Sequence, residues 1–440
     1  MIVRDDAARL LEQWENSRQY IEDILHAHFR EFSGDARDRR FLQEIVYGAV
    51  RWIGLLDYML KTQYHGQFHK AEYLVKNLLR LGLYQILFME SVPEAVAIHE
   101  TVESSKRLNK SEASGLINGV LRSVLRERKA IEAEIHGLEP VRRLSVQESH
   151  PEWLVQRWID RYGEESAIQL CRWNNRSQDV TIRANTTQVS LDQIVSRMKR
   201  EEIPFTQSEY LPEFFVLSKS QQLFSGNLIP DEWYAVQDQA AGLASSCVQP
   251  SRRDLVIDGC SAPGGKATYL RQRYGNSIDI FAGDISIERL KKVPQLIRRL
   301  QLSDLNYICM DARTYPLPKA ERILLDVPCS GTGVMGKRVD ARWRLEEKHI
   351  SKFAGLQSGI LNNASQALKP GGIFIYSTCT LEPEENWGII ENFLETHPDF
   401  SIITQPGWIP EQMMDQHNAM QTLPHRDRMD GAFTVRLQRS

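Results

Sequence analysis

Two cysteines in this sequence of 440 residues stand where side chains could do chemistry. Cys329 lies just after Asp326, Cys379 lies just after Thr378, and each segment follows a short apolar run. A thiolate that adds to carbon 6 of a pyrimidine turns the ring into an enamine, which is nucleophilic at carbon 5. After carbon 5 has taken up an alkyl group, a second group must help to expel the thiolate. The pair therefore predicts covalent pyrimidine chemistry, with Asp326 placed to stabilise the adduct at ring nitrogen 3. Spacing alone does not decide which thiol attacks.

The other cysteines fit a packing role better than a chemical one. A lone cysteine usually behaves as a small apolar residue, and this is the prediction for Cys171, Cys247 and Cys309. Cys260 lies inside a glycine-rich loop and is predicted to pack there. No two cysteines form a C-x-x-C pair, so the sequence indicates neither a metal site nor a disulfide framework.

The glycine-rich loop, residues 259–265, joins an apolar run to a helical stretch. Such strand-to-helix turns bring backbone N–H groups close to a ligand. A phosphate-binding P-loop has four residues between its first glycine and its Gly-Lys pair, but five residues separate Gly259 from Gly265, and Ala267 replaces the metal-binding hydroxyl. The loop also lacks the dinucleotide pattern G-x-G-x-x-G. The loop therefore predicts a ligand with an adenosine moiety and no required phosphate, held by Cys260, Ser261, Ala262, Pro263, Gly264, Gly265 and Lys266.

Acidic residues follow three further apolar runs. Asp284, about 20 residues past the loop, is placed to accept hydrogen bonds from ribose hydroxyls. Asp311 is placed to accept from an adenine amino group, and Asp326 lies near the same ligand. The other interpretation of any one of them is a helix N-cap. Because acids stand at successive strand ends, a ligand site is the preferred interpretation of all three.

The chain from residue 254 onward alternates apolar runs with helical stretches. The apolar runs are residues 255–257, 278–282, 306–309, 323–325 and 373–376. This alternation predicts a mostly parallel sheet with helices on both faces. In such sheets ligands bind beyond the carboxyl ends of the strands. The loop, the acids and both cysteines are all expected at that edge.

The first 130 residues carry apolar residues at helical spacing, for example Leu42, Ile45, Val46 and Ala49. This spacing predicts an all-α domain of several helices. We therefore expect a multidomain chain with an all-α domain over residues 1–140, a mixed α/β connector over 141–235 and an α/β catalytic domain over 236–440.

The bulk composition is that of an ordinary globular protein, with 42% hydrophobic and 25% charged residues. The net charge of −3 gives no global signal for nucleic acid, so any such surface must be local. Residues 1–10 lack the apolar core of a signal peptide, and no apolar run approaches the roughly 18 residues that span a membrane. We expect a cytoplasmic monomer, in a compartment where thiols stay reduced.

One local basic stretch follows the Pro-Cys segment. Its cations surround an aromatic residue, a combination that suits tracking an RNA backbone and stacking on bases. The predicted RNA contacts are Lys337, Arg338, Arg342, Trp343 and Arg344. A solvated helix face is the other interpretation of this stretch. The same choice applies to a second cluster, Arg122, Arg126, Arg128 and Lys129.

These motifs closely resemble the RNA 5-methylcytosine methyltransferases of the Nol1/Nop2/Sun family. The glycine loop resembles that family's cofactor motif, and Pro328-Cys329 and Thr378-Cys379 resemble its two signature cysteine pairs. Further likenesses lie in Arg183-Ala184-Asn185, residues 236–241 and Asp430-Gly431-Ala432-Phe433, although the family more often has two aromatics after the last glycine. The N-terminal region resembles the NusB-type RNA-binding domain, at residues 41–48, 97–102 and 118–122.

The resemblance implies a class I, Rossmann-like methyltransferase that uses S-adenosylmethionine and acts on RNA. It assigns attack on carbon 6 to Cys379 and product release to Cys329, whereas DNA cytosine methyltransferases attack with the Pro-Cys thiol. A NusB-like domain joined to this catalytic domain implies cytosine 967 of 16S ribosomal RNA as the target, with no DNA or membrane partner. The alternatives are the same chemistry on transfer RNA or another ribosomal site, and a non-catalytic RNA-binding assembly factor.

Overall fold

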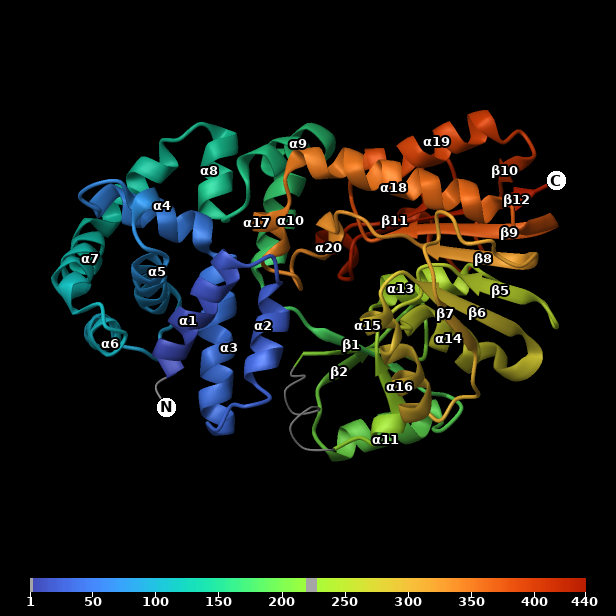
Figure 1. The fold of residues 1–440 in the computed structure, drawn as a ribbon, viewed down its shortest axis with the longest axis horizontal. Helices are drawn as coiled ribbons and strands as arrows, with labels where there is room; N and C mark the ends of the chain where they lie inside the picture. Colours follow the sequence, from blue (N-terminus) through green and yellow to red (C-terminus); the bar gives the residue numbers. More distant parts are fainter. Residues whose placement is uncertain (1–2, 219–227) are drawn as a thin grey trace. The chain divides into compact units, whose positions relative to one another are not determined.

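The structure of the protein is a computed structural model that describes residues 3–218 and 228–440 (Figure 1). The chain divides into two compact units, one made of Met1–Arg176 with Met335–Leu345 and one made of Ser177–Val334 with Glu346–Ser440. The first unit is helical and the second is α/β, which confirms the predicted fold class. The helical unit runs past the expected boundary at residue 140 and also takes in a segment from the second half of the chain.

The helical unit is built around one buried helix. Its helices are α1 (Val3–Asn16), α2 (Ile21–His28), α3 (Ala36–Arg51), α4 (Ile53–Gln63), α5 (Tyr73–Phe88), α6 (Glu94–Arg107), α7 (Ser114–His136), α8 (Pro140–Gln147), α9 (Glu152–Tyr162) and α10 (Glu164–Asn175). Every residue of α5 from Leu74 to Ile86 is buried, as expected of a helix that is surrounded by others. Arg80 within it pairs with Glu15 at 2.8 Å and with Asp57 at 2.6 Å, so the buried charge is compensated.

The segment Met335–Leu345 packs into the helical unit and contains the short helix α17 (Ala341–Arg344). The Asp340 carboxylate accepts hydrogen bonds from Trp14 Nε1 at 3.0 Å and from the backbone N–H of Ile21 at 2.9 Å. Trp343 Nε1 donates to the backbone oxygen of Val50 at 2.8 Å. These contacts join residues more than 290 positions apart in sequence, so the segment is a structural part of the helical unit.

The α/β unit begins with a small antiparallel sheet in the order β2-β3-β1-β4. Its strands are β1 (Val180–Ala184), β2 (Phe205–Gln207), β3 (Phe214–Leu217) and β4 (Tyr234–Val236). Helix α11 (Leu191–Arg200) begins with a capping box formed by Ser190 and Gln193. Ile194 and Met198 of this helix pack into one apolar cluster with Ile182 of the sheet.

The large sheet has the strand order β10-β12-β9-β8-β5-β6-β7, with β11 added on β12. Its strands are β5 (Leu255–Asp258), β6 (Asp279–Asp284), β7 (Asn306–Cys309), β8 (Ala320–Asp326), β9 (Leu368–Thr378), β10 (Phe400–Ile402), β11 (Met420–Thr422) and β12 (Ala432–Arg439). Strands β5 to β9 pair in parallel, and β12 is antiparallel to both β9 and β10. The strand order reverses on either side of β5, and ligands bind near such switch points.

Helices cover both faces of this sheet (Figure 1). One face packs against α13 (Gln239–Ser246), α14 (Gly265–Tyr274) and α16 (Lys292–Arg299). The other packs against α18 (Glu347–Ser365) and α19 (Trp387–Thr396). The short helices α15 (Ile287–Leu290) and α20 (Pro424–Asp427) complete the unit. Because both faces are covered, the carboxyl edge of the sheet is where polar side chains can gather.

Candidate functional site

Cys329 and Cys379 lie together beyond the ends of two neighbouring strands. Strands β8 and β9 pair in parallel with Asp326 opposite Ser377, so the segments that leave them start side by side. The two Sγ atoms are 3.3 Å apart, within hydrogen-bonding distance. The hydrogen bond to Cys379, together with desolvation, raises the pKa of Cys329 well above its usual value. The protonated form of Cys329 is therefore favoured, and either sulfur can be the donor in this hydrogen bond.

The backbone behind the thiols is packed too closely for side chains. The Gly333 N–H donates to the backbone oxygen of Cys379 at 3.1 Å, and the Gly431 N–H donates to the backbone oxygen of Gly333 at 2.9 Å. A Cβ on Gly333 would lie 2.4 Å from the Gly431 oxygen, so only glycine fits there. Two residues on, the buried Phe433 packs edge-on against Trp387. The closing segment after Asp430 thus supports the cysteine segments from behind.

Lys266, in the first turn of α14, reaches the strand-end segment that contains Asp326 and Cys329. Lys266 Nζ lies 2.6 Å from an Asp326 oxygen, and its side chain is only 12% exposed. Burial alone would lower the pKa of Lys266, but the charges of Asp326, Asp258 and Cys379 outweigh burial and raise that pKa. Lys266 therefore remains a cation beside Cys379. A nearby cation favours the thiolate form of a cysteine.

Asp258, the last residue of β5, is a buried acid that was not among the predicted site residues. It is completely buried, and both carboxylate oxygens lack a hydrogen bond of normal geometry within the described residues, although Ser261 lies beside them. Burial raises the pKa of Asp258 to about 7. A buried polar group without partners is costly. The signal in the sequence was an acid directly before a glycine turn.

The glycine loop has a backbone shape that side chains would not allow. Gly264 stands at the N-cap of α14 with φ +104°, and a Cβ there would lie 3.2 Å from Val293. The loop is tied to the sheet because the Ser261 N–H donates to the backbone oxygen of Gly283 at 2.8 Å. Its exit thus presents the first turn of α14, with its free N–H groups, at the carboxyl edge.

The remaining cysteines divide into packed and exposed residues. Cys171 and Cys247 are buried, and Cys260 packs against the core on one face of the large sheet, which confirms the predicted packing role for these three. Cys309 is exposed at the end of an edge strand, so the packing prediction is wrong for this residue. The sequence could not show this, because β7 reads as apolar whether or not another element covers it.

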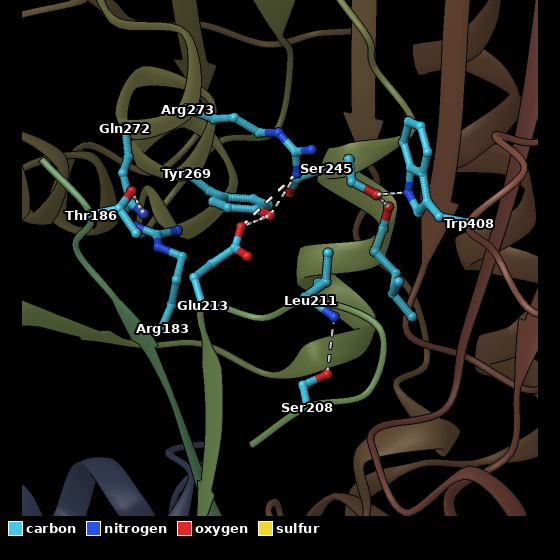
Figure 2. A network of polar contacts seen from close by, with 12 residues as sticks. Arg183, Thr186, Ser208, Leu211, Glu213, Ser245, Tyr269, Gln272, Arg273 and Trp408 are labelled. Atoms are coloured by element: carbon cyan, nitrogen blue, oxygen red, sulfur yellow. Dashed lines mark hydrogen bonds and ion pairs between the residues drawn. The ribbon is translucent and has the colours of Figure 1, made fainter. Parts of the chain in front are cut away.

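A polar network behind the loop fixes the start of α14 (Figure 2). Arg183 of β1 is fully buried and donates to the backbone oxygen of Gly265 at 3.0 Å and to the side-chain oxygen of Gln237. Its guanidinium lies 5.0 Å from the ring centre of Tyr269, whose hydroxyl donates to Glu213 at 2.5 Å. The two segments that contain Arg183 and Gln237 therefore brace the helix that follows the glycine loop.

Asp284 is held by three donors of the chain itself. The backbone N–H groups of Ala262 and Ser286 donate to its carboxylate at 3.1 and 2.9 Å. Arg289 donates to both oxygens, at 2.8 and 3.0 Å. The Asp284 side chain is 1% exposed, whereas that of Arg289 is 52% exposed. A ribose that binds Asp284 would therefore have to take the place of the exposed Arg289 guanidinium, and not of the backbone donors.

Asp311 lies beyond the end of β7 in a similar arrangement. Its carboxylate accepts from the backbone N–H of Arg313 at 3.0 Å and from the Arg313 guanidinium at 2.6 Å. These hydrogen bonds lower the pKa of Asp311 below its usual value. Neither acid is a helix N-cap, because Ser286 caps the helix that follows Asp284 and no helix begins at Asp311. An adenine contact at Asp311 would again require an arginine to move.

The basic stretch after Cys329 is largely structural. Arg342 is completely buried and donates to the backbone oxygens of Ser149 and Asn174 at 3.2 and 3.1 Å. The prediction of an RNA contact for Arg342 is therefore wrong, because its guanidinium is enclosed by protein. Trp343 and Arg344 are half-buried and also donate to backbone oxygens of the helical unit. The exposed residues of the stretch are Lys337 and Arg338.

The residues present fit S-adenosylmethionine. Carboxylates stand along the carboxyl edge of the sheet, at Asp258, Asp284, Asp311 and Asp326. A row of acids repels phosphate but suits a ligand that carries a sulfonium and an ammonium group. Asp258 supplies the buried oxygens that still lack partners. The strand order, the glycine loop and these acids together define a class I S-adenosylmethionine-dependent methyltransferase.

Comparison with known proteins identifies the family. The profile described as 16S rRNA methyltransferase RsmB/F matches residues 245–438, NusB matches residues 1–126, and the ferredoxin-like domain of RsmF/B-like methyltransferases matches residues 150–223. The probable ribosomal RNA small subunit methyltransferase B of Bacillus subtilis is 31% identical over 99% of this chain and 98% of its own. The chain therefore belongs to the RsmB/F family of 16S rRNA methyltransferases.

A further relative agrees with this assignment, and a solved structure shares the fold. Ribosomal RNA small subunit methyltransferase B of Vibrio cholerae is 31% identical over 98% of this chain and 96% of its own. The crystal structure of PH0851 superposes with a TM-score of 0.83 at 23% identity and covers 99% of this chain and 98% of that chain, which shows a shared fold. The predicted enzyme class is confirmed, and the non-catalytic alternative is not supported.

No described helix is both long and apolar enough to pass through a bilayer. Within residues 3–218 and 228–440, no group of three or more histidine, cysteine or acidic side chains is arranged to hold a metal ion.

Proposed function

We propose that this protein methylates carbon 5 of cytosine 967 in 16S ribosomal RNA through a covalent bond between Cys379 and carbon 6 of the base. The observation that carries the proposal is the pair of thiols 3.3 Å apart at neighbouring strand ends, beside a buried lysine. One thiol is suited to attack and the other to hold a proton. The position of the base rests on the family layout, and the chemistry rests on the site.

The first step is the addition of the Cys379 thiolate to carbon 6. The Lys266 cation and the hydrogen bond from Cys329 both favour the ionised form of Cys379. Bond formation between Sγ and carbon 6 moves the electron pair of the ring double bond to carbon 5. This assignment agrees with the resemblance, and the raised pKa of Cys329 disfavours the thiolate that attack by this residue would need.

Asp326 is placed to stabilise the adduct. It borders Lys266 at 2.6 Å, and its side chain is 35% exposed, so part of the carboxylate faces outward. Paired with the lysine, the carboxylate can accept a hydrogen bond from a protonated ring nitrogen 3. That contact would spread the charge that develops in the ring when the thiolate adds.

The second step removes the carbon 5 proton and breaks the bond between Cys379 and carbon 6. Bound S-adenosylmethionine supplies the methyl group that carbon 5 acquires between the two steps. Transfer of the carbon 5 proton to solvent water restores the ring double bond, and the electron pair of the S–C bond returns to the Cys379 sulfur. Cys329, which lies at hydrogen-bonding distance from that sulfur, assists its departure.

The cofactor would be held by the loop and by the acids. Cys260, Ser261, Ala262, Pro263, Gly264, Gly265 and Lys266 form the loop, and Asp258, Asp284, Asp311 and Asp326 line the edge. The buried Asp258 carboxylate is suited to the amino group of the methionine moiety. Asp284 and Asp311 would take the ribose and the adenine once Arg289 and Arg313 release them.

The RNA partner would meet this edge with its target base unstacked. A base inside a helix cannot reach a thiol at a sheet edge, so it must be flipped or lie in an unpaired region. Lys337 and Arg338 follow Cys329 in the sequence, are exposed, and would contact the phosphate backbone. We further propose that the protein acts as a monomer in the cytoplasm.

A labelling experiment tests this function. Unmodified 16S ribosomal RNA is incubated with the protein and methyl-labelled S-adenosylmethionine, with Cys379→Ala as the matched control. The expected result is label on carbon 5 of a single cytosine, at position 967, and none with the control. Label at another cytosine would overturn the position alone, and the absence of any carbon 5 label would overturn the reaction.

A further inference from the structure

A buried carboxylate binds both cysteine segments. Glu385 ends the turn Pro383–Glu385 and is completely buried. One of its oxygens accepts from the backbone N–H of Ser330 at 2.9 Å, and the other accepts from the Thr380 hydroxyl at 3.3 Å. Ser330 directly follows Cys329, and Thr380 directly follows Cys379. The same carboxylate therefore ties together the two residues that come next after the thiols.

Hydroxyl groups add a second set of links between these segments. The hydroxyl oxygens of Ser330 and Thr380 are 2.6 Å apart, and those of Thr332 and Thr380 are 3.0 Å apart. The Thr332 oxygen also accepts from the backbone N–H of Leu381 at 2.9 Å. All three hydroxyl residues are buried. Buried polar groups that are mutually satisfied hold a local structure rigidly.

Gln357 of α18 holds the Cys329 segment from the other side. This residue is completely buried, and its Nε2 donates to the backbone oxygen of Pro328 at 3.0 Å and to Glu385 at 2.8 Å. Pro328 directly precedes Cys329. The backbone on both sides of Cys329 is thus anchored to Gln357 and Glu385, which lie on different elements.

The position of Glu385 is costly for stability alone. Its partners are neutral donors, and burial raises the pKa of Glu385 above its usual value. Apolar residues of similar volume often stabilise such a place as well or better. The hydrogen bonds of Glu385 therefore point to a role in placing the segments rather than in strengthening the core.

We propose that Glu385, supported by Gln357, is a positioning residue that sets the separation of the Cys329 and Cys379 sulfurs for the two-step reaction. It acts through Ser330 and Thr380 and does not touch the substrate. The inference rests on the proposed function, because the thiols that it places are those assigned to attack and release. A shift of about 1 Å at reacting groups can cost about 100-fold in rate, so small displacements would be measurable.

The first experiment measures thiol separation without any substrate. Diamide oxidises two adjacent thiols to a disulfide: the thiols lose two protons and two electrons, and the N=N bond of diamide takes them up to become a hydrazine. The rate of Cys329–Cys379 disulfide formation in the full-length protein is followed by mass spectrometry of its peptides. This rate depends on whether the sulfurs meet, and it does not depend on methyl transfer.

The variants separate position from charge. We expect Glu385→Ala to slow disulfide formation at least 10-fold. Glu385→Gln should keep a rate near that of the parent, because its amide oxygen can accept from Ser330 and Gln357 while its nitrogen donates to Thr380. The matched control is Glu384→Gln, an exposed neighbour that should leave the rate unchanged. Rescue by glutamine distinguishes positioning from loss of a buried charge.

A second variant covers the case in which Glu385→Ala fails to fold. Gln357→Met fills the same space and removes the two hydrogen bonds to Pro328 and Glu385, so it should also slow disulfide formation. Parent-like rates in Glu385→Ala or, if that variant is unfolded, in Gln357→Met would overturn the proposal. So would an equal loss in Glu385→Gln and Glu385→Ala, because the amide can make the same contacts.

Steady-state kinetics then links the separation to catalysis. The expected result for Glu385→Ala is a lower kcat with little change in KM for S-adenosylmethionine or RNA, since no ligand contact is removed. Slower disulfide formation with an unchanged kcat would support the effect on thiol separation but contradict the proposed reaction. The two inferences therefore fail in distinguishable ways.

Discussion

Arg342 offers a sharp test of whether the basic stretch binds RNA or holds the helical unit together. It donates to the backbone oxygens of Ser149 and Asn174 and, at 2.7 Å, to the side-chain oxygen of Asn175. Arg342→Met keeps the bulk of the side chain and leaves these three acceptors without a donor. Each such hydrogen bond contributes about 1 kcal/mol net, so the expected loss in the free energy of unfolding is about 3 kcal/mol.

The loss is measured as a shift in thermal unfolding of the helical unit. For a unit of this size, 1 kcal/mol corresponds to about 2–4 °C, so the Tm of the transition should fall by about 6–12 °C. The control is Arg338→Met, in which an exposed cation of the same stretch is removed. We expect that control to keep the parent Tm but to weaken RNA binding, most strongly at low salt.

The two variants should therefore show opposite behaviour. Below its unfolding transition, Arg342→Met should bind 16S ribosomal RNA as the parent does, because its guanidinium is enclosed by protein. The reasoning is refuted if Arg342→Met keeps the parent Tm and loses RNA affinity. That result would mean that the segment leaves the helical unit in solution and presents Arg342 to RNA.

Three further predictions concern the site itself. Lys266→Met should slow alkylation of Cys379 by iodoacetamide at neutral pH about 10-fold, because the cation that favours the thiolate is removed. The rate is followed by peptide mass spectrometry, and an unchanged rate would contradict this prediction. Asp258→Asn should change the pH dependence of stability. Burial raises the pKa of Asp258 from 3.8 to about 7, so the folded parent retains a proton that the unfolded chain has released, and stability falls as pH rises between these values. Between these pH values the asparagine variant should lose up to about 4 kcal/mol less free energy of unfolding than the parent, measured by urea titration of the ligand-free proteins. If the free energies of unfolding of the two proteins change with pH in the same way, the prediction is wrong. Gly333→Ala should destabilise the α/β unit by about 3 kcal/mol, because the new Cβ would lie 2.4 Å from the Gly431 oxygen. The control Gly355→Ala should not destabilise it, because a Cβ there has nothing within 4 Å. Equal Tm values for the two variants would contradict the close packing at Gly333.

The part of the site that was predictable lies at the strand ends. Short apolar runs followed by Asp326-Val327-Pro328-Cys329 and by Thr378-Cys379 place both thiols at one edge, because parallel strands end on the same side. That β8 and β9 are neighbours could not be read from the sequence. It depends on strand order, which is set by how the helices pack on both faces.

The roles of Glu385 and Arg342 could not be predicted from the sequence for a related reason. Glu385 follows Cys379 by six positions, but its contact with Ser330 comes from the turn between β9 and α19. The sequence around Arg342 is typical of a surface segment. It does not show that this segment packs into the helical unit, which consists mostly of residues 1–176. Contacts between distant segments decide both cases, and hydrophobic periodicity carries no information about them.

The structure shows what two of the segments that resemble the family contribute to the fold. Arg183 and Gln237 were only likenesses in the sequence, yet Arg183 donates to Gln237 and to Gly265 in the first turn of α14. A buried guanidinium that donates to the backbone oxygen of Gly265 fixes where that turn begins. The glycine loop therefore depends on the small sheet for its position as well as on its own sequence.

The most direct test of the covalent role of Cys379 is to trap its bond to RNA. Parent, Cys329→Ala and Cys379→Ala proteins are incubated with unmodified 16S ribosomal RNA and S-adenosylmethionine, and the products are run on a denaturing gel. Loss of Cys329 should trap a protein–RNA adduct, which mass spectrometry should place on Cys379, and Cys379→Ala should give none. An adduct formed by Cys379→Ala and absent from Cys329→Ala would contradict the assignment.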